Sequence, residues 1–265
     1  MASRLVTITS DFGGSDHFVG TMKGVILSVN PQAQVVDLCN SINSFDVLDG
    51  ALTLAQASRY FPPDTVHLVV VDPGVGSAVR RPLLVATTNH YFVAPDNGVL
   101  SLVMEREERV TVRHITAEHY FLQPVSNTFH GRDVFAPCAG WLSKGVEPEK
   151  FGEEITDYVR FTLPRPKLAS ERVMKGAVLK VDKFGNLITN LTSENAPAVF
   201  APGAKVKITV GQSTATALHS NYAAGQHGEL FAILNSMGFL EIACNRAPAV
   251  QMTKAGRGAE VTVEF

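Results

Sequence analysis

The residues of this sequence that could do chemistry lie in two segments far apart along the chain. Asp72 and the pair Arg80-Arg81 belong to the first segment, and His130 belongs to the second. If the fold brings them together, a carboxylate, a guanidinium and an imidazole could hold and polarise a water molecule, and a neutral imidazole could take its proton. An enzyme is therefore the leading hypothesis.

A third segment adds Asp11 at a point where a strand is expected to run into a helix. A carboxylate at the carboxyl end of a strand faces the crevice in which open α/β sheets bind ligands. There it can accept two hydrogen bonds from a cis-diol such as that of a ribose. The alternative, equally favoured by the residues alone, is that Asp11 only caps the turn around Gly13-Gly14.

The glycines that follow Asp72 predict a tight turn rather than a phosphate site. Gly74-Val75-Gly76 lacks the Lys-Ser/Thr of a P-loop, and no Rossmann glycine fingerprint follows the first expected strand. A turn would leave Asp72 facing the crevice, where a nearby Arg keeps the carboxylate ionised.

His130 stands out among the eight histidines because it follows Phe129, precedes Gly131 and lies just before a charged pair. A structural role remains the alternative for His130, and it is the expected role of most of the others. No H-x-x-x-H or H-E-x-x-H pattern is present, so the sequence predicts no metal site. The histidines expected to be structural are His67, His90, His114, His119, His219 and His227, with His17 less certain.

The second half of the chain carries two polar turns between apolar strands. The first contains Asp182, Phe184 and Asn186, and the second contains Asn235 and Ser236. Hairpin turns explain both on the residues alone. The alternative is the polar and aromatic edge of a pocket for a flat base and a zwitterion.

The elements that would position these residues differ between the two halves. Residues 1–165 alternate strand-like and helix-like stretches, which predicts a layered α/β domain. Expected strands are 5–9, 35–38, 66–71, 83–87 and 91–94, and expected helices are 46–60, 98–106, 134–143 and one capped by Asp16. After the stiff stretch 163–166, residues 173–265 alternate polar and apolar residues, which predicts a smaller antiparallel β barrel.

Composition limits the function classes. The formal net charge of −2 shows no basic excess for nucleic acid or an anionic membrane, and no apolar run is long enough to span a bilayer. The start, Met1–Ile8, reads as a strand and not as a signal peptide. Three scattered cysteines form no disulfide framework, so a cytoplasmic location is expected and the sequon at Asn190 is attributed to chance.

Together the segments resemble the adenosine-forming S-adenosylmethionine hydrolases, a family related to the fluorinase and the chlorinase. The similarity runs in one order through almost the whole chain. The matching stretches are 9–24 (TSDFGGSDHFVGTMKG), 71–81, 94–100 (APDNGVL), 128–136 (TFHGRDVFA), 182–190 and 235–243.

The resemblance implies conversion of S-adenosylmethionine (SAM) and water to adenosine and L-methionine, without a cofactor. It implies a homotrimer with sites between the N-terminal half of one subunit and the C-terminal half of the next. The implied catalytic residues are Asp72, Arg80 and His130. The implied substrate contacts are Asp11 (ribose), Phe45 (aromatic wall), Asp182, Asn235 and Ser236 (the turns at the methionine), and Phe184 and Asn186 (adenine).

Two features favour water over halide as the nucleophile. The chain keeps Asp72 and His130, which the halogenases lack, and Gly131 takes the position of a halide-contacting serine. The loop from Asp72 to the arginine pair is one residue longer than usual in the hydrolases. Arg80 is therefore preferred as the catalytic arginine, and Arg81 remains an alternative. A SAM-dependent halogenase and a non-catalytic nucleoside-binding sensor remain the alternatives.

Overall fold

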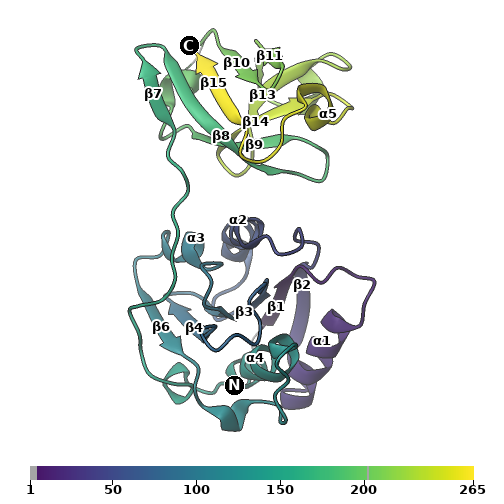
Figure 1. The fold of residues 1–265 in the computed structure, drawn as a ribbon, viewed down its shortest axis with the longest axis vertical. Coiled ribbons are helices and arrows are strands. Elements are labelled where there is room, and N and C mark those ends of the chain that lie inside the picture. Colours follow the sequence, from purple (N-terminus) through teal and green to yellow (C-terminus); the bar gives the residue numbers. More distant parts are fainter. Residues whose placement is uncertain (1–4, 202) are drawn as a thin grey trace. The chain divides into compact units, whose positions relative to one another are not determined.

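The computed structural model describes residues 5–201 and 203–265, which form two compact units, residues 1–162 and 163–265 (Figure 1). The sequence predicted a strand within Met1–Ile8. Met1–Arg4 lie outside the described residues, and the first strand begins at Leu5. The stretch 163–166 contains no helix or strand, as its two prolines predict. Among the described helices, none combines the length and the hydropathy needed to cross a membrane.

Unit 1 is a mixed α/β structure around a six-stranded sheet with the order β2-β1-β3-β5-β4-β6. The first four strands in this order are parallel to their neighbours, and β4 runs antiparallel to both β5 and β6. Every residue of β3 is buried, including His67, as its nearly all-apolar sequence predicts for a strand covered on both faces. The strands are β1 (Leu5–Ser10), β2 (Gln34–Cys39), β3 (Val66–Val70), β4 (Pro82–Thr87), β5 (Tyr91–Pro95) and β6 (Val110–His114).

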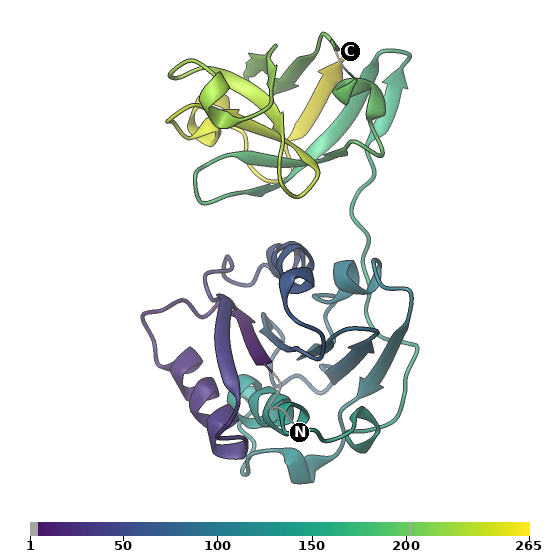
Figure 2. The same cartoon turned by 180° about the vertical axis from the view of Figure 1, so that it is seen from behind.

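Two pairs of helices pack on this sheet. Helices α1 (Phe18–Val29) and α4 (Ala136–Ser143) share one buried cluster with alternate residues of β1 and β3. Helices α2 (Val47–Ala57) and α3 (Ser101–Met104) contact each other, and α2 also contacts β1 (Figure 2). The short helical turns are η1 (Ser58–Tyr60), η2 (Glu118–Tyr120), the π-helical η3 (Gly131–Phe135) and η4 (Pro148–Lys150).

Unit 2 is a curled nine-stranded sheet whose main path is β11-β10-β15-β8-β9-β14-β13-β12, with β7 paired to β8 (Figure 1). All its pairs are antiparallel except β12 with β13, which is parallel. The strands are β7 (Lys167–Ser170), β8 (Val173–Val181), β9 (Leu187–Thr192), β10 (Lys207–Val210), β11 (Ser213–Ala215), β12 (Leu218–His219), β13 (Leu230–Leu234), β14 (Phe239–Cys244) and β15 (Glu260–Glu264). The helical elements are η5 (Pro197–Phe200), η6 (Tyr222–Ala224) and α5 (Ala249–Thr253).

The structure confirms the five expected strands of unit 1 and the helix after Asp46, whose side chain accepts a hydrogen bond from Asp49 N. Two expectations were wrong. Helix α1 begins at Phe18, with His17 rather than Asp16 at its N-cap. The helix expected at 98–106 is the single turn α3, which begins only after Gly98, whose φ of +90° is not helical. Strand β6 and the parallel pair β12–β13 were not anticipated.

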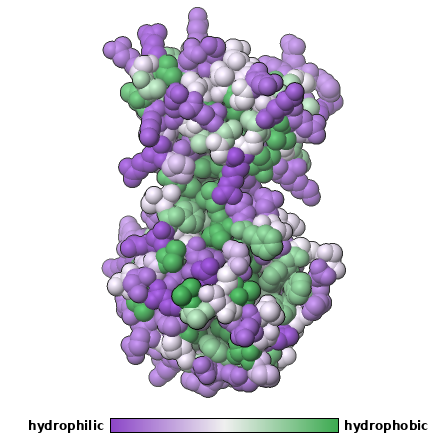
Figure 3. All heavy atoms as spheres, in the orientation of Figure 1, coloured by the Kyte–Doolittle hydropathy of each residue, from purple (hydrophilic) through white to green (hydrophobic). Residues whose placement is uncertain are grey.

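Hydrophilic side chains form most of the visible surface of both units, interrupted by apolar patches (Figure 3). The most exposed large apolar side chains include Phe45 and Val79 in unit 1 and Phe184 in unit 2, all more than 70% exposed.

Candidate active site

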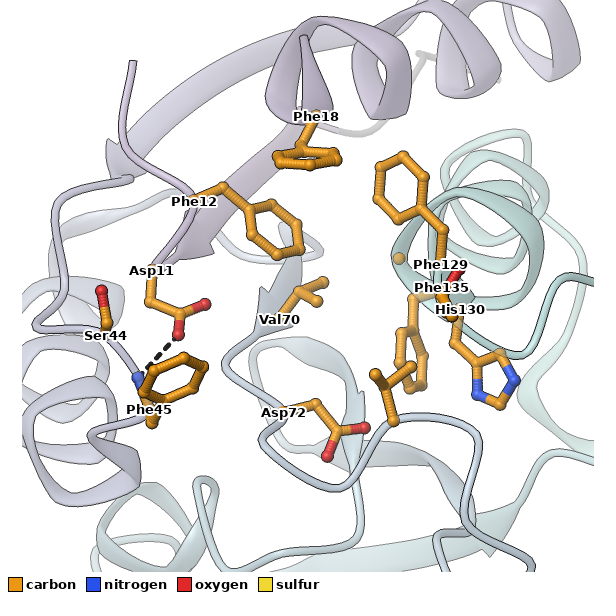
Figure 4. A pocket seen from close by; sticks show the side chains of 13 residues that line it. Asp11, Phe12, Phe18, Ser44, Phe45, Val70, Asp72, Phe129, His130 and Phe135 are labelled. Carbon is orange, nitrogen blue, oxygen red and sulfur yellow. Dashed lines mark hydrogen bonds between the residues drawn. The ribbon is translucent and has the colours of Figure 1, made fainter. Parts of the chain in front are cut away.

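A cavity of about 300 Å³ opens in unit 1 at the carboxyl ends of β1 and β3. Asp11 and Phe45 lie on one side of it, His130 lies on the other, and Asp72 lies between them (Figure 4). Phenylalanines dominate the remaining wall. The lining residues are Asp11, Phe12, Phe18, Ser44, Phe45, Val70, Asp72, Val75, Thr128, Phe129, His130, Gly131 and Phe135.

The Asp72 carboxylate is buried, with its side chain only 3% exposed. Its Oδ1 accepts a hydrogen bond from Gly74 N at 3.0 Å and lies 2.9 Å from Arg80 Nε. Its Oδ2 is buried and has no hydrogen-bond partner among the described residues. Burial raises the pKa of Asp72 above its usual value, although the charge of Arg80 acts in the opposite direction. The carboxylate is thus held by one oxygen, and the other is left to accept a bond from a ligand or water.

The two adjacent arginines have different partners. Arg80 contacts Asp72 and donates through Nη1 to the carbonyl oxygen of Asp96. Arg81 forms ion pairs with the carboxylates of Asp96 and Asp157, at 2.7 and 2.9 Å. Gly74 leaves room for the Arg80 side chain beside Asp72, because a Cβ at position 74 would lie 2.6 Å from Arg80 Nη2.

His130 is half-buried and directly precedes the π-helical turn η3. The next charged residues anchor that turn: Arg132 pairs with both oxygens of the buried Asp133, at 2.6 and 2.9 Å. Burial raises the pKa of Asp133, but the bonds from Arg132 and from Ser126 N outweigh it and leave this pKa below its usual value. The anchored turn fixes the backbone that carries His130, as π-helical turns often do at functional sites.

Gly131 packs closely against the floor of the cavity. A Cβ at this position would lie 3.1 Å from Met22 Sδ and 3.2 Å from a ring carbon of Phe129. A serine would therefore be accommodated only if these neighbours moved by a few tenths of an ångström.

Asp11 Oδ2 accepts a hydrogen bond from Phe45 N at 2.9 Å. The capping alternative for Asp11 finds no support, because Gly13 N donates to Asn40 O instead. Phe45 has a φ of +66°, an unusual conformation for an aromatic residue, and the residue is 73% exposed. Asp11 thus fixes the loop that presents Phe45 at the edge of the cavity.

Unit 2 has a second cavity of about 640 Å³, whose rim includes the Asp182 turn. Asp182 Oδ1 accepts from Phe184 N and Asn186 N, and its Oδ2 accepts from Asn186 Nδ2. The lining residues are Asp182, Phe184, Asn186, Tyr222, Cys244, Asn245, Arg246, Ala247 and Pro248.

The Asn235 turn is organised from within. Asn235 Oδ1 accepts from Met237 N and Phe239 N, which leaves Ser236 exposed at the tip. Behind it lies Glu241, which sequence reasoning missed, although a lone acid in the apolar strand Phe239–Cys244 was a detectable signal. Burial raises the pKa of Glu241, against the effect of its hydrogen bonds from Asn235 and Tyr222.

No group of three or more His, Cys, Asp or Glu side chains that could hold a metal ion occurs within residues 5–201 and 203–265. The cysteines in this part of the chain, Cys39, Cys138 and Cys244, are all free thiols.

Comparison with known proteins gives consistent results for both units. The profile described as SAM hydroxide adenosyltransferase N-terminal domain matches residues 6–152, and the profile of the corresponding C-terminal domain matches residues 176–262. The (R)-S-adenosyl-L-methionine hydrolase of Thermus thermophilus is 35% identical, over 93% of this chain and 94% of that protein. A fluorinase from an Actinoplanes species is 27% identical, over 98% of this chain and 97% of that protein.

A solved structure of an uncharacterised conserved protein from Thermotoga maritima is also similar. It has a TM-score of 0.91 and 35% sequence identity, and the match covers 98% of this chain and all of that one.

Proposed function

Because the chain belongs to the SAM hydroxide adenosyltransferase family, we propose that it is an S-adenosyl-L-methionine hydrolase that forms adenosine and L-methionine. The observation that supports this most strongly is the buried Asp72, which contacts Arg80 through one oxygen and lines the cavity with its other oxygen unpaired. A protein that only binds a nucleoside has no need of such a group.

The chemistry requires a positioned nucleophile more than an acid. The sulfonium of SAM is already a good leaving group, so methionine departs without protonation. The difficulty is to hold water in line with C5′ at roughly 3 Å, where positioning contributes several kcal/mol. Asp72 and His130 orient the water, a neutral His130 takes its proton, and Arg80 holds Asp72.

Substrate binding is assigned to the remaining residues of both units. Asp11 accepts hydrogen bonds from the ribose hydroxyls, and Phe45 forms an aromatic wall. In unit 2, Asp182 and Ser236 contact the methionine portion, Asn235 shapes the turn of Ser236, and Phe184 and Asn186 contact the adenine. The two cavities and their exposed aromatic rings support this division.

The assembly assigned to the chain is a cytoplasmic homotrimer with each site between unit 1 of one subunit and unit 2 of the next. In this arrangement unit 1 serves as a layered α/β domain and the curled sheet of unit 2 as a small barrel. Phe45, Val79 and Phe184 are each more than 70% exposed, and burial of such large apolar side chains would favour an interface.

The test is to incubate the purified protein with SAM and separate the products by chromatography, with and without chloride or fluoride. Adenosine and methionine are expected in both conditions. A 5′-halo-5′-deoxyadenosine would instead establish the halogenase, which the fluorinase relative keeps as the second candidate. Binding by calorimetry with no product after long incubation would establish a sensor.

A further inference from the structure

Glu241 is an anomaly in the core of unit 2. It lies on β14, whose other residues, Phe239, Leu240, Ile242, Ala243 and Cys244, are apolar and buried. The Glu241 residue is itself only 3% exposed. Among the described residues no cation pairs with it, and the charged group that influences it is another carboxylate, Asp182.

The Glu241 carboxylate joins two separate pieces of unit 2. Its Oε2 accepts a hydrogen bond from Asn235 Nδ2 at 3.0 Å, and its Oε1 accepts one from Tyr222 OH at 2.8 Å. Tyr222 lines the cavity of unit 2 together with Asp182. One buried group therefore restrains both the rim of this cavity and the side chain that organises the neighbouring turn.

The bond to Asn235 determines which way that amide faces. With Nδ2 directed at Glu241, Oδ1 is left to accept from Met237 N and Phe239 N at 3.0 and 3.1 Å. If the amide turned over, its NH₂ group would face these two backbone donors. The conformation of the turn that presents Ser236 thus depends on an acceptor at position 241.

Stability alone does not explain a carboxylate here. An unpaired buried charge is costly, and well-packed apolar residues usually replace buried charges without loss of stability. We propose that Glu241 is a positioning residue, which sets the Ser236 turn through Asn235 and the cavity rim through Tyr222 for binding of the substrate. This inference rests on the proposed function.

The test is a reciprocal exchange of donor and acceptor. Glu241→Met removes the acceptor of Asn235 Nδ2, and Asn235→Asp directs a second carboxylate at Glu241, so each of these single variants breaks the contact. Glu241→Gln alone should keep the contact, because its carbonyl oxygen can accept from Asn235 Nδ2 while its amide donates to the Tyr222 hydroxyl oxygen. The double variant combines Glu241→Gln with Asn235→Asp. In the double variant, the introduced glutamine amide donates to the introduced aspartate, whose other oxygen still accepts from Met237 N and Phe239 N. Adenosine formation gives KM and kcat, calorimetry gives Kd for SAM, and thermal unfolding checks the fold.

Glu241→Met and Asn235→Asp are each expected to raise KM and Kd about tenfold or more, as loss of a hydrogen bond to a charged group implies. kcat should change by less than about twofold, because the attack at C5′ is remote from this turn. The double variant should recover most of the affinity. Tyr222→Phe, which removes only the rim contact, should have a smaller effect.

Glu229→Gln is the matched control, since Glu229 pairs with His219 in the same unit and should not affect KM. The inference is overturned if Glu241→Met leaves KM and Kd unchanged, if kcat falls as much as KM rises, or if the double variant binds SAM no better than Asn235→Asp. A wild-type protein that binds SAM but forms no adenosine refutes the proposed function, and the Kd values still decide this inference.

Discussion

Arg80 and Arg81 are neighbours in the sequence, but we predict that only Arg80 controls the ionisation of Asp72. Arg80 Nε lies 2.9 Å from Asp72 Oδ1, and the Asp72 side chain is 3% exposed. A cation this close to a carboxylate lowers its pKa by about one to three units, each equivalent to about 1.4 kcal/mol. Arg80→Ala removes that effect and leaves the desolvation, so the pKa of Asp72, already raised, should rise further.

The pKa can be read directly from the ¹³Cγ chemical shift of labelled aspartates in a pH titration, with Asp72→Asn identifying the signal. Arg81→Ala is the control, because its guanidinium pairs with Asp96 and Asp157 and should shift their signals instead. In Arg80→Ala the acid limb of kcat/KM should move to higher pH in parallel, since a protonated Asp72 no longer offers the negative charge that polarises the water. An unchanged Asp72 titration in Arg80→Ala would refute this reasoning.

Three further predictions concern other residues. Burial lowers the pKa of His67 to about 3. As the pH falls below 6.5, the ordinary pKa of histidine, this residue therefore takes up a proton only in the unfolded state. The free energy of unfolding, measured with urea, should fall by about 2 kcal/mol between pH 7 and pH 5. His67→Gln should lack this loss, and an equal loss in both proteins would contradict the assignment. His130→Ala should depress kcat strongly and leave KM nearly unchanged, whereas Asp11→Ala should mainly raise KM, through loss of charged hydrogen bonds of roughly 1.5–3 kcal/mol each; wild-type turnover in His130→Ala would remove His130 from the mechanism. Inactive His130→Ala and Asp182→Ala proteins should recover activity when their subunits exchange, and no recovery in proven mixed trimers would place each site within one chain.

The sequence was sufficient to predict the residues at strand ends. Asp72 follows a nearly all-apolar strand, which is typical of a strand buried on both faces, and the glycines after it predicted a turn. The sequence could not distinguish Arg80 from Arg81, because their roles depend on Asp96 and Asp157, which are distant in the chain.

Glu241 was missed for a related reason. Alternating patterns show which face of a strand is buried, but they do not show that a buried acid meets Asn235 and Tyr222. The short helix α3 and the edge strand β6 were misjudged because their local patterns are weak and tertiary contacts decide their extent.

The central claim is that water attacks C5′ of SAM, and isotopic labelling tests it most directly. The purified protein is incubated with SAM in water enriched in oxygen-18, and the adenosine formed is examined by mass spectrometry with fragmentation. Attack by water predicts one labelled oxygen, located at the 5′ position of the ribose, and unlabelled methionine. Adenosine without the label, or label in the methionine, would contradict attack of water at C5′.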